Sequence, residues 1–314
     1  FKKKLNSFKK KSFLIAVSGG PDSLALTALA KSYSYENKCK IYYALVDHNL
    51  RRNSSSEAKS VKKLLKKHQI ILNVLKNKKP IEKNIQSEAR VVRYDLLTSF
   101  CKKRKIKTML TAHNLEDQVE TFFIRLSRGS GLHGLSSMKQ INKIGNGINL
   151  VRPLLDIKKT QLVKISKVIF GKYYKDPTNK NKKYLRTRIR NLKKSLETSG
   201  INYDQIFKSI KNLASSRDTL DLYFNKIYKE VVDNKKDKIS INLKNFNSFN
   251  QEMKMRIIKQ SITNITKAYY APRSKKILNL IDQLKVKKNV KLTLGGCFVL
   301  KEKNHIILRK EKKN

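Results

Sequence analysis

A six-residue loop, SGGPDS at positions 18–23, carries residue types that can bind an anion. An apolar run, Phe13–Val17, precedes it and a helix-forming run follows it, which predicts a buried strand, a tight turn and a helix. Pro21 and Asp22 suit the first turn of that helix. Backbone N–H groups at a helix N-terminus, together with the helix dipole, favour a phosphate. The loop lacks the lysine of a P-loop, so it predicts another kind of phosphate site or else an ordinary turn.

Two acidic residues on a second predicted helix could also do chemistry. Asp117 and Glu120 lie three positions apart within residues 114–128, so they share a helix face. A pair of carboxylates on one face can hold an ammonium group or a metal ion. The alternative is structural, because Asn114 followed three residues later by Asp117 is typical of a helix cap.

The composition indicates a polyanionic partner such as nucleic acid. The chain of 314 residues has 72 Lys and Arg against 23 Asp and Glu, which gives a net charge of +49. Arginine is the more specific signal, since its planar guanidinium suits phosphates and base edges. Arg186, Arg188 and Arg190 are therefore candidates for RNA binding. A solvated basic helix face is the alternative interpretation of this stretch.

Strands and helices alternate in the first half of the chain. Predicted strands at 41–50, 70–75 and 106–112 are separated by predicted helices at 56–68 and 85–103. This order predicts an α/β fold with a doubly wound parallel sheet, whose ligands bind at the carboxyl ends of the strands. The loop at Ser18 and the turns at Asp47 and His113 fall at such ends, so we expect them to share one crevice.

The second half has a different pattern. From about Lys158 the chain is predicted to be helical, with a long helix at 203–233 that ends in the polar run DNKKDK. A short strand near Ile239, two helices within 245–285 and a β-meander at 290–310 follow, with turns at 295–296 and 303–304. We expect a first domain over 1–215 with a helical extension and a small α+β domain over 216–314. A long helix and a polar linker, at about 216–238, join them.

Cysteine usage and hydropathy narrow the class of protein. Cys39, Cys101 and Cys297 are far apart and form no C-x-x-C pair, so they indicate neither a disulfide framework nor a zinc site. No apolar run approaches the length of about 18 residues that spans a membrane, and FKKKLNSFKKK lacks the apolar stretch of a signal peptide. We expect a soluble cytoplasmic protein without a membrane partner, whose oligomeric state the sequence leaves open.

Four further motifs accompany the loop in a fixed order. They are DHNLR at 47–51, SEARVVRY at 87–94, TAHNLEDQVETFFIRLSRGSGLHGL at 111–135 and KDPTN at 175–179. Together with SGGPDS, this set resembles the PP-loop ATP pyrophosphatases, and within them the tRNA(Ile)-lysidine synthases. The motif LGGCFVL at 294–300 lies in the small second domain. With this motif the chain resembles the short form of that family, which has one C-terminal domain.

The resemblance implies a two-step reaction. ATP adenylates the carbonyl oxygen at carbon 2 of the wobble cytidine in an isoleucine tRNA with a CAU anticodon, and pyrophosphate leaves. Free L-lysine then attacks that carbon through its ε-amine, and AMP leaves. The implied partners are this tRNA and lysine, with ATP as substrate and Mg²⁺ as cofactor. The domain over 1–215 would bind ATP and catalyse the reaction, and the domain over 216–314 would bind tRNA.

The resemblance also assigns residues. Asp22 would be a ligand for Mg²⁺, and Asp117 with Glu120 would hold lysine or a metal. Arg93 and His113 would face the triphosphate or the adenylated base. The chain departs from the usual family pattern at two positions, where Asn114 replaces a second histidine and Glu116 replaces an aspartate. Pyrophosphate would be bound by the loop residues Ser18, Gly19, Gly20, Pro21, Asp22 and Ser23.

Two other functions remain open at this point. A PP-loop tRNA thiolase uses the same adenylation but needs cysteines in or beside the crevice, and Cys39 and Cys101 do not follow predicted strands. A non-catalytic RNA-binding module would explain the charge, but acidic residues such as Asp22 and Asp117 in a binding groove would repel phosphate.

Overall fold

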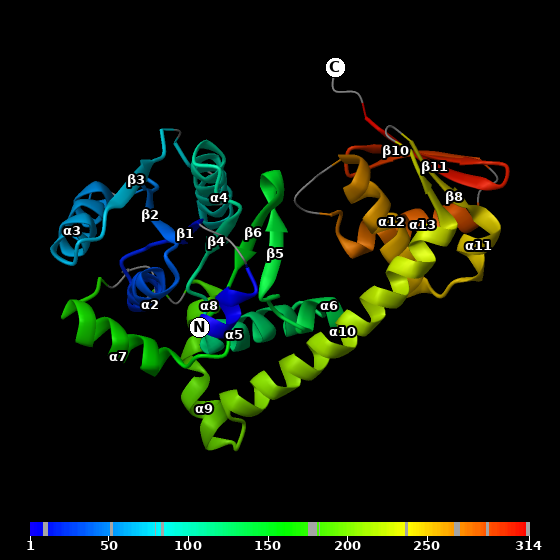
Figure 1. Cartoon of the computed structure of the whole chain (residues 1–314). Coiled ribbons are helices and arrows are strands. Elements are labelled where there is room, and N and C mark those ends of the chain that lie inside the picture. The colour runs from blue at the N-terminus through cyan, green and yellow to red at the C-terminus, as the bar shows by residue number, and fades with distance from the viewer. Residues whose placement is uncertain are drawn as a thin grey trace. The chain divides into compact units, whose positions relative to one another are not determined.

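The computed structural model describes residues 1–8, 12–50, 53–78, 80–82, 85–174, 181, 183–235, 238–266, 271–286 and 289–311. The chain divides into two compact units, Phe1–Ser215 and Ser216–Asn314, and the dividing point lies within the long helix α10 (Tyr203–Val231) (Figure 1). None of the helices in the described part of the chain is long and apolar enough to cross a membrane.

The first unit is built on a six-stranded sheet in the order β3-β2-β1-β4-β6-β5. All neighbouring strands pair in parallel except β5 and β6, which form an antiparallel hairpin at one edge. The predicted α/β class and parallel sheet are confirmed, whereas the antiparallel edge was not predicted. The strands are β1 (Ser12–Ala16), β2 (Lys40–Asp47), β3 (Leu72–Lys76), β4 (Thr108–Leu110), β5 (Ile141–Ile144) and β6 (Ile148–Val151).

Helices cover both faces of this sheet, as Figure 1 shows. Phe13 and Ile15 of β1 belong to one apolar core, with residues of α2, α3 and α7, while Leu14 belongs to another, with residues of α4. Because a central parallel strand is buried on both faces, β1 is apolar without interruption from Phe13 to Ala16. The helices are α1 (Lys2–Asn6), α2 (Pro21–Asn37), α3 (Ser54–Lys67), α4 (Ile85–Lys103), α5 (Leu115–Leu126), α6 (Leu132–Leu135), the 3-10 turn η1 (Gly145–Gly147), α7 (Lys159–Phe170), α8 (Leu185–Asn191) and α9 (Lys193–Thr198).

The second unit is a five-stranded antiparallel sheet in the order β7-β8-β11-β10-β9, with helices packed on its apolar face. The meander and both of its turns are confirmed; Gly295 and Gly296 adopt φ of +61° and +80° between β9 and β10. The elements are β7 (Val232–Asn234), β8 (Lys238–Asn242), α11 (Leu243–Ser248), α12 (Gln251–Thr266), α13 (Ser274–Val286), β9 (Val290–Leu294), β10 (Cys297–Glu302) and β11 (His305–Lys310).

Two details of this unit differ from the sequence-based expectation. Three helices, rather than two, lie between β8 and β9. The described residues on either side of the polar run are paired, because β7 pairs with β8 and the N–H of Lys235 donates to the carbonyl of Lys238 at 2.9 Å. Val232 and Ile239 on either side of the run are buried, so these apolar residues anchor a polar turn within the second unit.

Candidate active site

Polar clusters follow β1, β2 and β4, and all of them lie at the carboxyl ends of the parallel strands. These strands are adjacent and parallel, in the order β2-β1-β4. Their carboxyl ends therefore lead to the loop at Ser18, the turn at Asp47 and the turn at His113 on the same side. The expected convergence of these three motifs is confirmed at the level of the backbone.

The loop at 18–23 is closed by one hydroxyl group. The Oγ atom of Ser23 accepts hydrogen bonds from the N–H and the hydroxyl of Ser18, both at 3.1 Å, and donates to the carbonyl of Gly20 at 2.9 Å. Gly19 has φ of +80°, and a Cβ atom there would lie 2.5 Å from Cγ2 of Val61. Only glycine fits this position without movement of α3.

Helix α2 opens toward this loop. It begins at Pro21, as predicted, and its first hydrogen bond runs from the N–H of Leu24 to the carbonyl of Gly20. The N–H groups of Asp22 and Ser23 therefore remain at the open end of the helix. Such an end can bind phosphate oxygens.

Asp22 lies at the open end of α2 with one oxygen unpaired. Its side chain is 22% exposed, and Oδ2 lies 3.8 Å from Nζ of Lys159, the first residue of α7. The other oxygen, Oδ1, is buried and has no partner among the described residues. Burial raises the pKa of Asp22 to about 6 and the charge of Asp117 adds to this rise, while the charge of Lys159 and the nearby side-chain amide of Asn114 oppose it. An unpaired carboxylate oxygen is a ligand that Mg²⁺ prefers.

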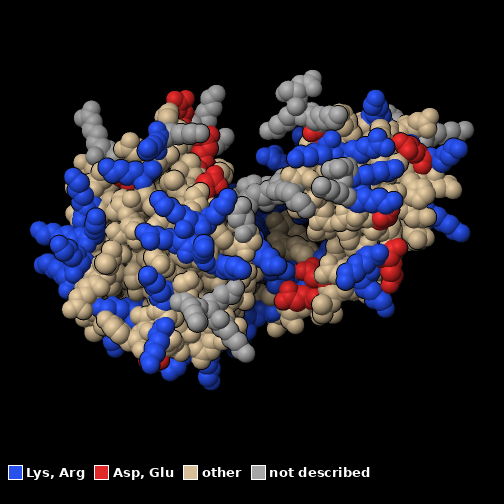
Figure 2. Space-filling view, turned by 45° about the horizontal axis from the view of Figure 1, so that its top comes forward, with Lys and Arg blue, Asp and Glu red and all other residues tan. Residues whose placement is uncertain are grey.

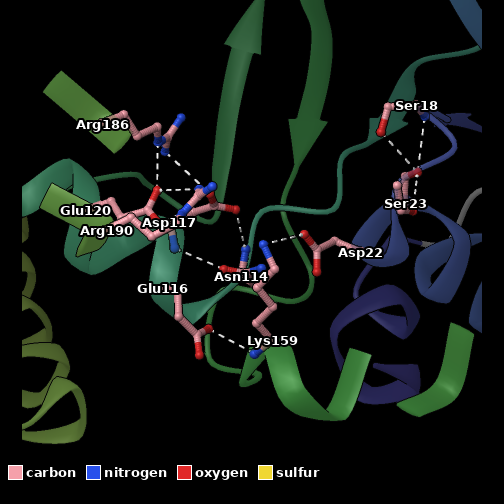
Figure 3. A network of polar contacts seen from close by, with 11 residues as sticks. Ser18, Asp22, Ser23, Asn114, Glu116, Asp117, Glu120, Lys159, Arg186 and Arg190 are labelled. Atoms are coloured by element: carbon pink, nitrogen blue, oxygen red, sulfur yellow. Dashed lines mark hydrogen bonds and ion pairs between the residues drawn. The ribbon is translucent and has the colours of Figure 1, made fainter. Parts of the chain in front are cut away.

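The start of α5 forms a reciprocal helix cap. The side chain of Asn114 accepts from the N–H of Asp117 at 2.9 Å, and Oδ2 of Asp117 accepts from the N–H of Asn114 at 3.1 Å. The capping interpretation of this pair is thus confirmed. The other oxygen of Asp117, Oδ1, lies 3.4 Å from Nη2 of Arg186, so this carboxylate also faces the site (Figure 3).

Glu120 is the most buried acidic residue of the site, with a side chain 2% exposed. Its carboxylate accepts from Nε of Arg186 at 2.8 Å and from Nε of Arg190 at 2.7 Å. These two arginines, which we expected to bind RNA, come from α8 and point at Glu120, whereas Arg188 between them is exposed. The local pattern does not predict the contact with Glu120, and RNA binding by these three arginines stays a prediction.

A hydrogen bond to Glu116 connects α5 with α7. Its Oε2 atom accepts from the backbone N–H of Lys159 at 2.9 Å, and the N–H of Leu115 donates to the carbonyl of Ile157 at 3.1 Å. Both departures from the family pattern therefore have a structural role here: Asn114 caps α5 and Glu116 caps α7. The sequence analysis did not single out Lys159.

His113 lies in a positively charged surrounding. Its Nδ1 atom is 3.0 Å from the hydroxyl of Thr111. Burial lowers the pKa of His113 to about 3, and the charges of Arg152 and Arg186 add to this effect, with smaller contributions from other arginines that include Arg93. The imidazole is therefore neutral at pH 7, so it can take part in hydrogen bonds but is a weak base.

Arg93 contacts the second motif. Its Nε atom donates to Nε2 of His48 at 3.4 Å, and burial together with the Arg93 charge lowers the pKa of His48 to about 4. His48 was not among the predicted site residues, although the motif DHNLR contains it. Its neighbour Asp47 is buried and holds the turn, since it accepts from the N–H of Asn49 at 3.0 Å and from the hydroxyl of Ser55 at 2.6 Å.

Comparison with known proteins identifies the family. A family model described as a PP-loop domain matches residues 1–196. A tRNA(Ile)-lysidine synthase from Wolbachia pipientis wMel is 35% identical over 313 residues, which cover 98% of this chain and 72% of that protein. The chain belongs to the PP-loop tRNA(Ile)-lysidine synthase family. A second member, from Rickettsia bellii strain OSU 85-389, is 31% identical over 98% of this chain and 71% of its own length. Because these relatives are longer than the chain, the expectation of a single C-terminal domain stays a prediction.

A solved structure shows the same fold. The U34-tRNA thiolase NcsA from Methanococcus maripaludis, solved with its [4Fe-4S] cluster, has a TM-score of 0.56 and 18% identity, over 68% of this chain and 77% of that chain. The present chain, a lysidine synthase family member, has two cysteines in its first unit, Cys39 and Cys101. Cys39 lies at the amino end of β2, away from the site edge, and Cys101 is buried in α4. Neither thiol is placed for sulfur transfer.

Two further findings concern residues that could belong to the site. No group of three or more His, Cys, Asp and Glu side chains that could hold a metal occurs in the described part of the chain. The motif KDPTN at 175–179 lies outside the described residues.

Proposed function

We propose that this protein is a ligase that joins free lysine to carbon 2 of the wobble cytidine in an isoleucine tRNA, with ATP converted to AMP and pyrophosphate. The observation that carries the proposal is the juxtaposition, at one edge of the sheet, of an open helix N-terminus and a pair of carboxylates. The relatives named as lysidine synthases support it along nearly the whole chain. An amide-like carbonyl oxygen is a poor leaving group, so an adenylated oxygen is needed before an amine can replace it.

The loop at 18–23 suits the first step. The N–H groups at the start of α2 would bind the β and γ phosphates, while Gly19 keeps the backbone close to them. Asp22 would hold Mg²⁺ through its unpaired Oδ1 atom, and the ion would neutralise charge on the departing pyrophosphate.

The carboxylates suit the second step, with unequal roles. Glu120 is already paired with Arg186 and Arg190, so its charge is used to fix these guanidinium groups. Asp117 keeps one oxygen toward Arg186 at the longer distance of 3.4 Å and is the better ligand for the ammonium groups of lysine. Near pH 7 the attacking amine, with a pKa of about 10.4, must lose a proton first. His113 is not a candidate for accepting this proton, because its lowered pKa of about 3 makes the imidazole a weak base.

A direct experiment tests this function. The protein is incubated with ATP, an isoleucine tRNA transcript with a CAU anticodon and radiolabelled lysine, and a methionine tRNA with the same anticodon serves as the control. We expect the radiolabelled lysine to be joined to the isoleucine tRNA and AMP to be released. Release of ADP, or transfer of sulfur in place of lysine, would refute the proposal.

The second unit would supply RNA contacts. Its sheet carries a groove of about 790 Å³ in which four lysines and His305 outnumber Asp233 and Glu302. Figure 2 shows that Lys and Arg side chains cover much more of the visible face than the few acidic side chains do. Basic side chains on a rigid surface suit the backbone of an RNA helix. The four lysines of the groove are Lys235, Lys238, Lys301 and Lys303.

Charge-neutral variants test this groove. Lys235→Gln, Lys238→Gln and Lys303→Gln together should lower the slope of log K against log salt for tRNA binding by about 2, at about 0.7–0.9 for each lost phosphate contact. The matched control replaces Lys259, Lys275 and Lys276, which are exposed on α12 and α13. Equal effects of the two triple variants would show that only net charge matters.

Since the substrates proposed here are found in the cytoplasm, we also propose that location.

A further inference from the structure

The phosphate loop lacks a lysine of its own, but a lysine reaches it from elsewhere in the chain. Lys159 begins α7, more than a hundred positions after the loop, and its Nζ atom lies 3.8 Å from Oδ2 of Asp22. Figure 3 shows this side chain extending from α7 toward the start of α2. The ammonium group therefore stands beside the open helix end where phosphates would bind.

The backbone of Lys159 is fixed while its side chain stays accessible. The carboxylate of Glu116 accepts from the Lys159 N–H at 2.9 Å, which anchors the first residue of α7 to α5. The side chain itself is 40% exposed. The preceding residue, Lys158, points elsewhere and pairs with Asp204 at 2.7 Å. Of these two neighbouring lysines, only Lys159 is directed to the loop.

The contact between Lys159 and Asp22 is loose. A hydrogen bond between an ammonium and a carboxylate is about 2.7–2.9 Å long, so a separation of 3.8 Å is a charge contact without a formed bond. A diphosphate carries more negative charge and more acceptor oxygens than one carboxylate, so it competes well for this ammonium group. Asp22 would then be released for a cation.

We propose that Lys159 contacts the β and γ phosphates of ATP and stabilises pyrophosphate as it leaves, in the role that a P-loop lysine plays within its own loop. This inference rests on the proposed adenylation. In that step the cytidine oxygen forms a bond to the α phosphorus, the bond from the α phosphorus to the bridging oxygen breaks, and its electron pair goes to pyrophosphate. Lys159 stays protonated, transfers no proton and neutralises part of the charge that develops.

The test compares substitutions at two adjacent lysines. Lys159→Gln removes the ammonium group but keeps the backbone N–H that Glu116 binds, so α7 retains its cap. Lys158→Gln is the matched control, and Lys159→Arg retains the charge. Binding of inorganic pyrophosphate with Mg²⁺ is measured by calorimetry, binding of Mg²⁺ alone is measured separately, and ATP–pyrophosphate exchange is measured with tRNA. Thermal unfolding verifies that each variant is folded.

We expect Lys159→Gln to weaken pyrophosphate binding by about 10-fold or more, the usual effect of losing a hydrogen bond to a charged group, while Lys158→Gln matches the wild type. Lys159→Arg should recover most of the affinity. Unchanged pyrophosphate affinity in a folded Lys159→Gln variant overturns the inference. So does a change in Mg²⁺ affinity alone, since Lys159 would then be only a partner of Asp22. If the wild type showed no exchange but Lys159→Gln still lost pyrophosphate affinity, the proposed adenylation would fail and the phosphate contact would stand.

Discussion

Glu120 and Arg190 form a two-point ion pair in the first unit. Nε of Arg190 donates to Oε1 of Glu120 at 2.7 Å, and Nη2 donates to Oε2 at 3.1 Å. The hydrogen bond that Arg190 donates to Glu120 also raises the pKa of Arg190. Since the carboxylate is almost fully buried, with a side chain 2% exposed, this pair fixes α8 against α5.

Glu120→Gln should therefore reduce stability as well as activity. The substitution removes the buried charge that Arg190 and Arg186 both contact, so we expect the free energy of unfolding to fall by about 1–3 kcal/mol. Urea denaturation measures the change. The control is Glu197→Gln, because Glu197 is exposed and forms a looser ion pair, with its Oε1 atom 3.8 Å from Nζ of Lys193. We expect its free energy of unfolding to change by less than about 0.5 kcal/mol. Equal losses in the two variants would contradict a structural role for Glu120.

The two members of the α5 cap can be separated by substitution. Asp117→Asn keeps an oxygen that can accept from the N–H of Asn114 but removes the charge, so stability should change by about 0.5 kcal/mol or less. Asn114→Ala keeps the charge of Asp117 but removes the cap and should cost about 1 kcal/mol. If Asp117 holds the lysine substrate, Asp117→Asn should slow lysine transfer by about 10-fold or more with tRNA binding unchanged. Activities that simply follow stability in both variants would leave Asp117 as a cap alone.

Asp22 should make stability depend on pH in the absence of Mg²⁺. Its pKa in the folded state is raised from 3.8 to about 6, so its contribution is fully present below pH 3.8 and is lost as the pH rises through about 6. The free energy of unfolding of the wild type should fall relative to Asp22→Asn between pH 4 and pH 7, by up to about 3 kcal/mol at about 1.36 kcal/mol per pH unit. Urea denaturation across this range measures the difference, and a constant difference would rule out burial as the cause.

Arg188 and Arg190 should differ in RNA binding. Arg188 is exposed, so Arg188→Gln should lower the salt slope of tRNA binding by about 0.7–0.9 and leave stability within about 0.5 kcal/mol. Arg190→Gln should lower stability because it breaks the pair with Glu120. Filter binding at several salt concentrations, together with thermal unfolding, tests both statements. A normal salt slope for Arg188→Gln would remove α8 from the RNA-binding surface.

Features with local causes were predicted well from the sequence. The bounds predicted for the helix at 85–103 agree with α4, and α2 begins at Pro21, because proline and periodic apolar residues act within one or two turns. The turn at Gly295 and Gly296 was predicted for the same reason. The order of strands and helices also predicted the parallel sheet, since a strand-helix-strand unit has few packing solutions.

Features with distant causes required the fold. The edge hairpin of β5 and β6 was not predicted, because both strands are short and their pairing depends on where the sheet ends. The pairing of β7 with β8 was not predicted either, and it depends on buried residues on both strands, Val232 and Ile239. In each case the deciding contacts are between residues that the local pattern does not relate.

The sequence by itself determined the family motifs, the glycine that the phosphate loop requires and the acidic face of α5, because each depends on a few consecutive residues and their backbone preferences. Only the tertiary structure decided that Arg186 and Arg190 face Glu120, and that Lys159 stands beside Asp22. These pairs are 66, 70 and more than a hundred positions apart. The physical reason is that an ion pair needs two side chains a few ångströms apart, and this distance is set by the packing of α5, α7 and α8 around the sheet.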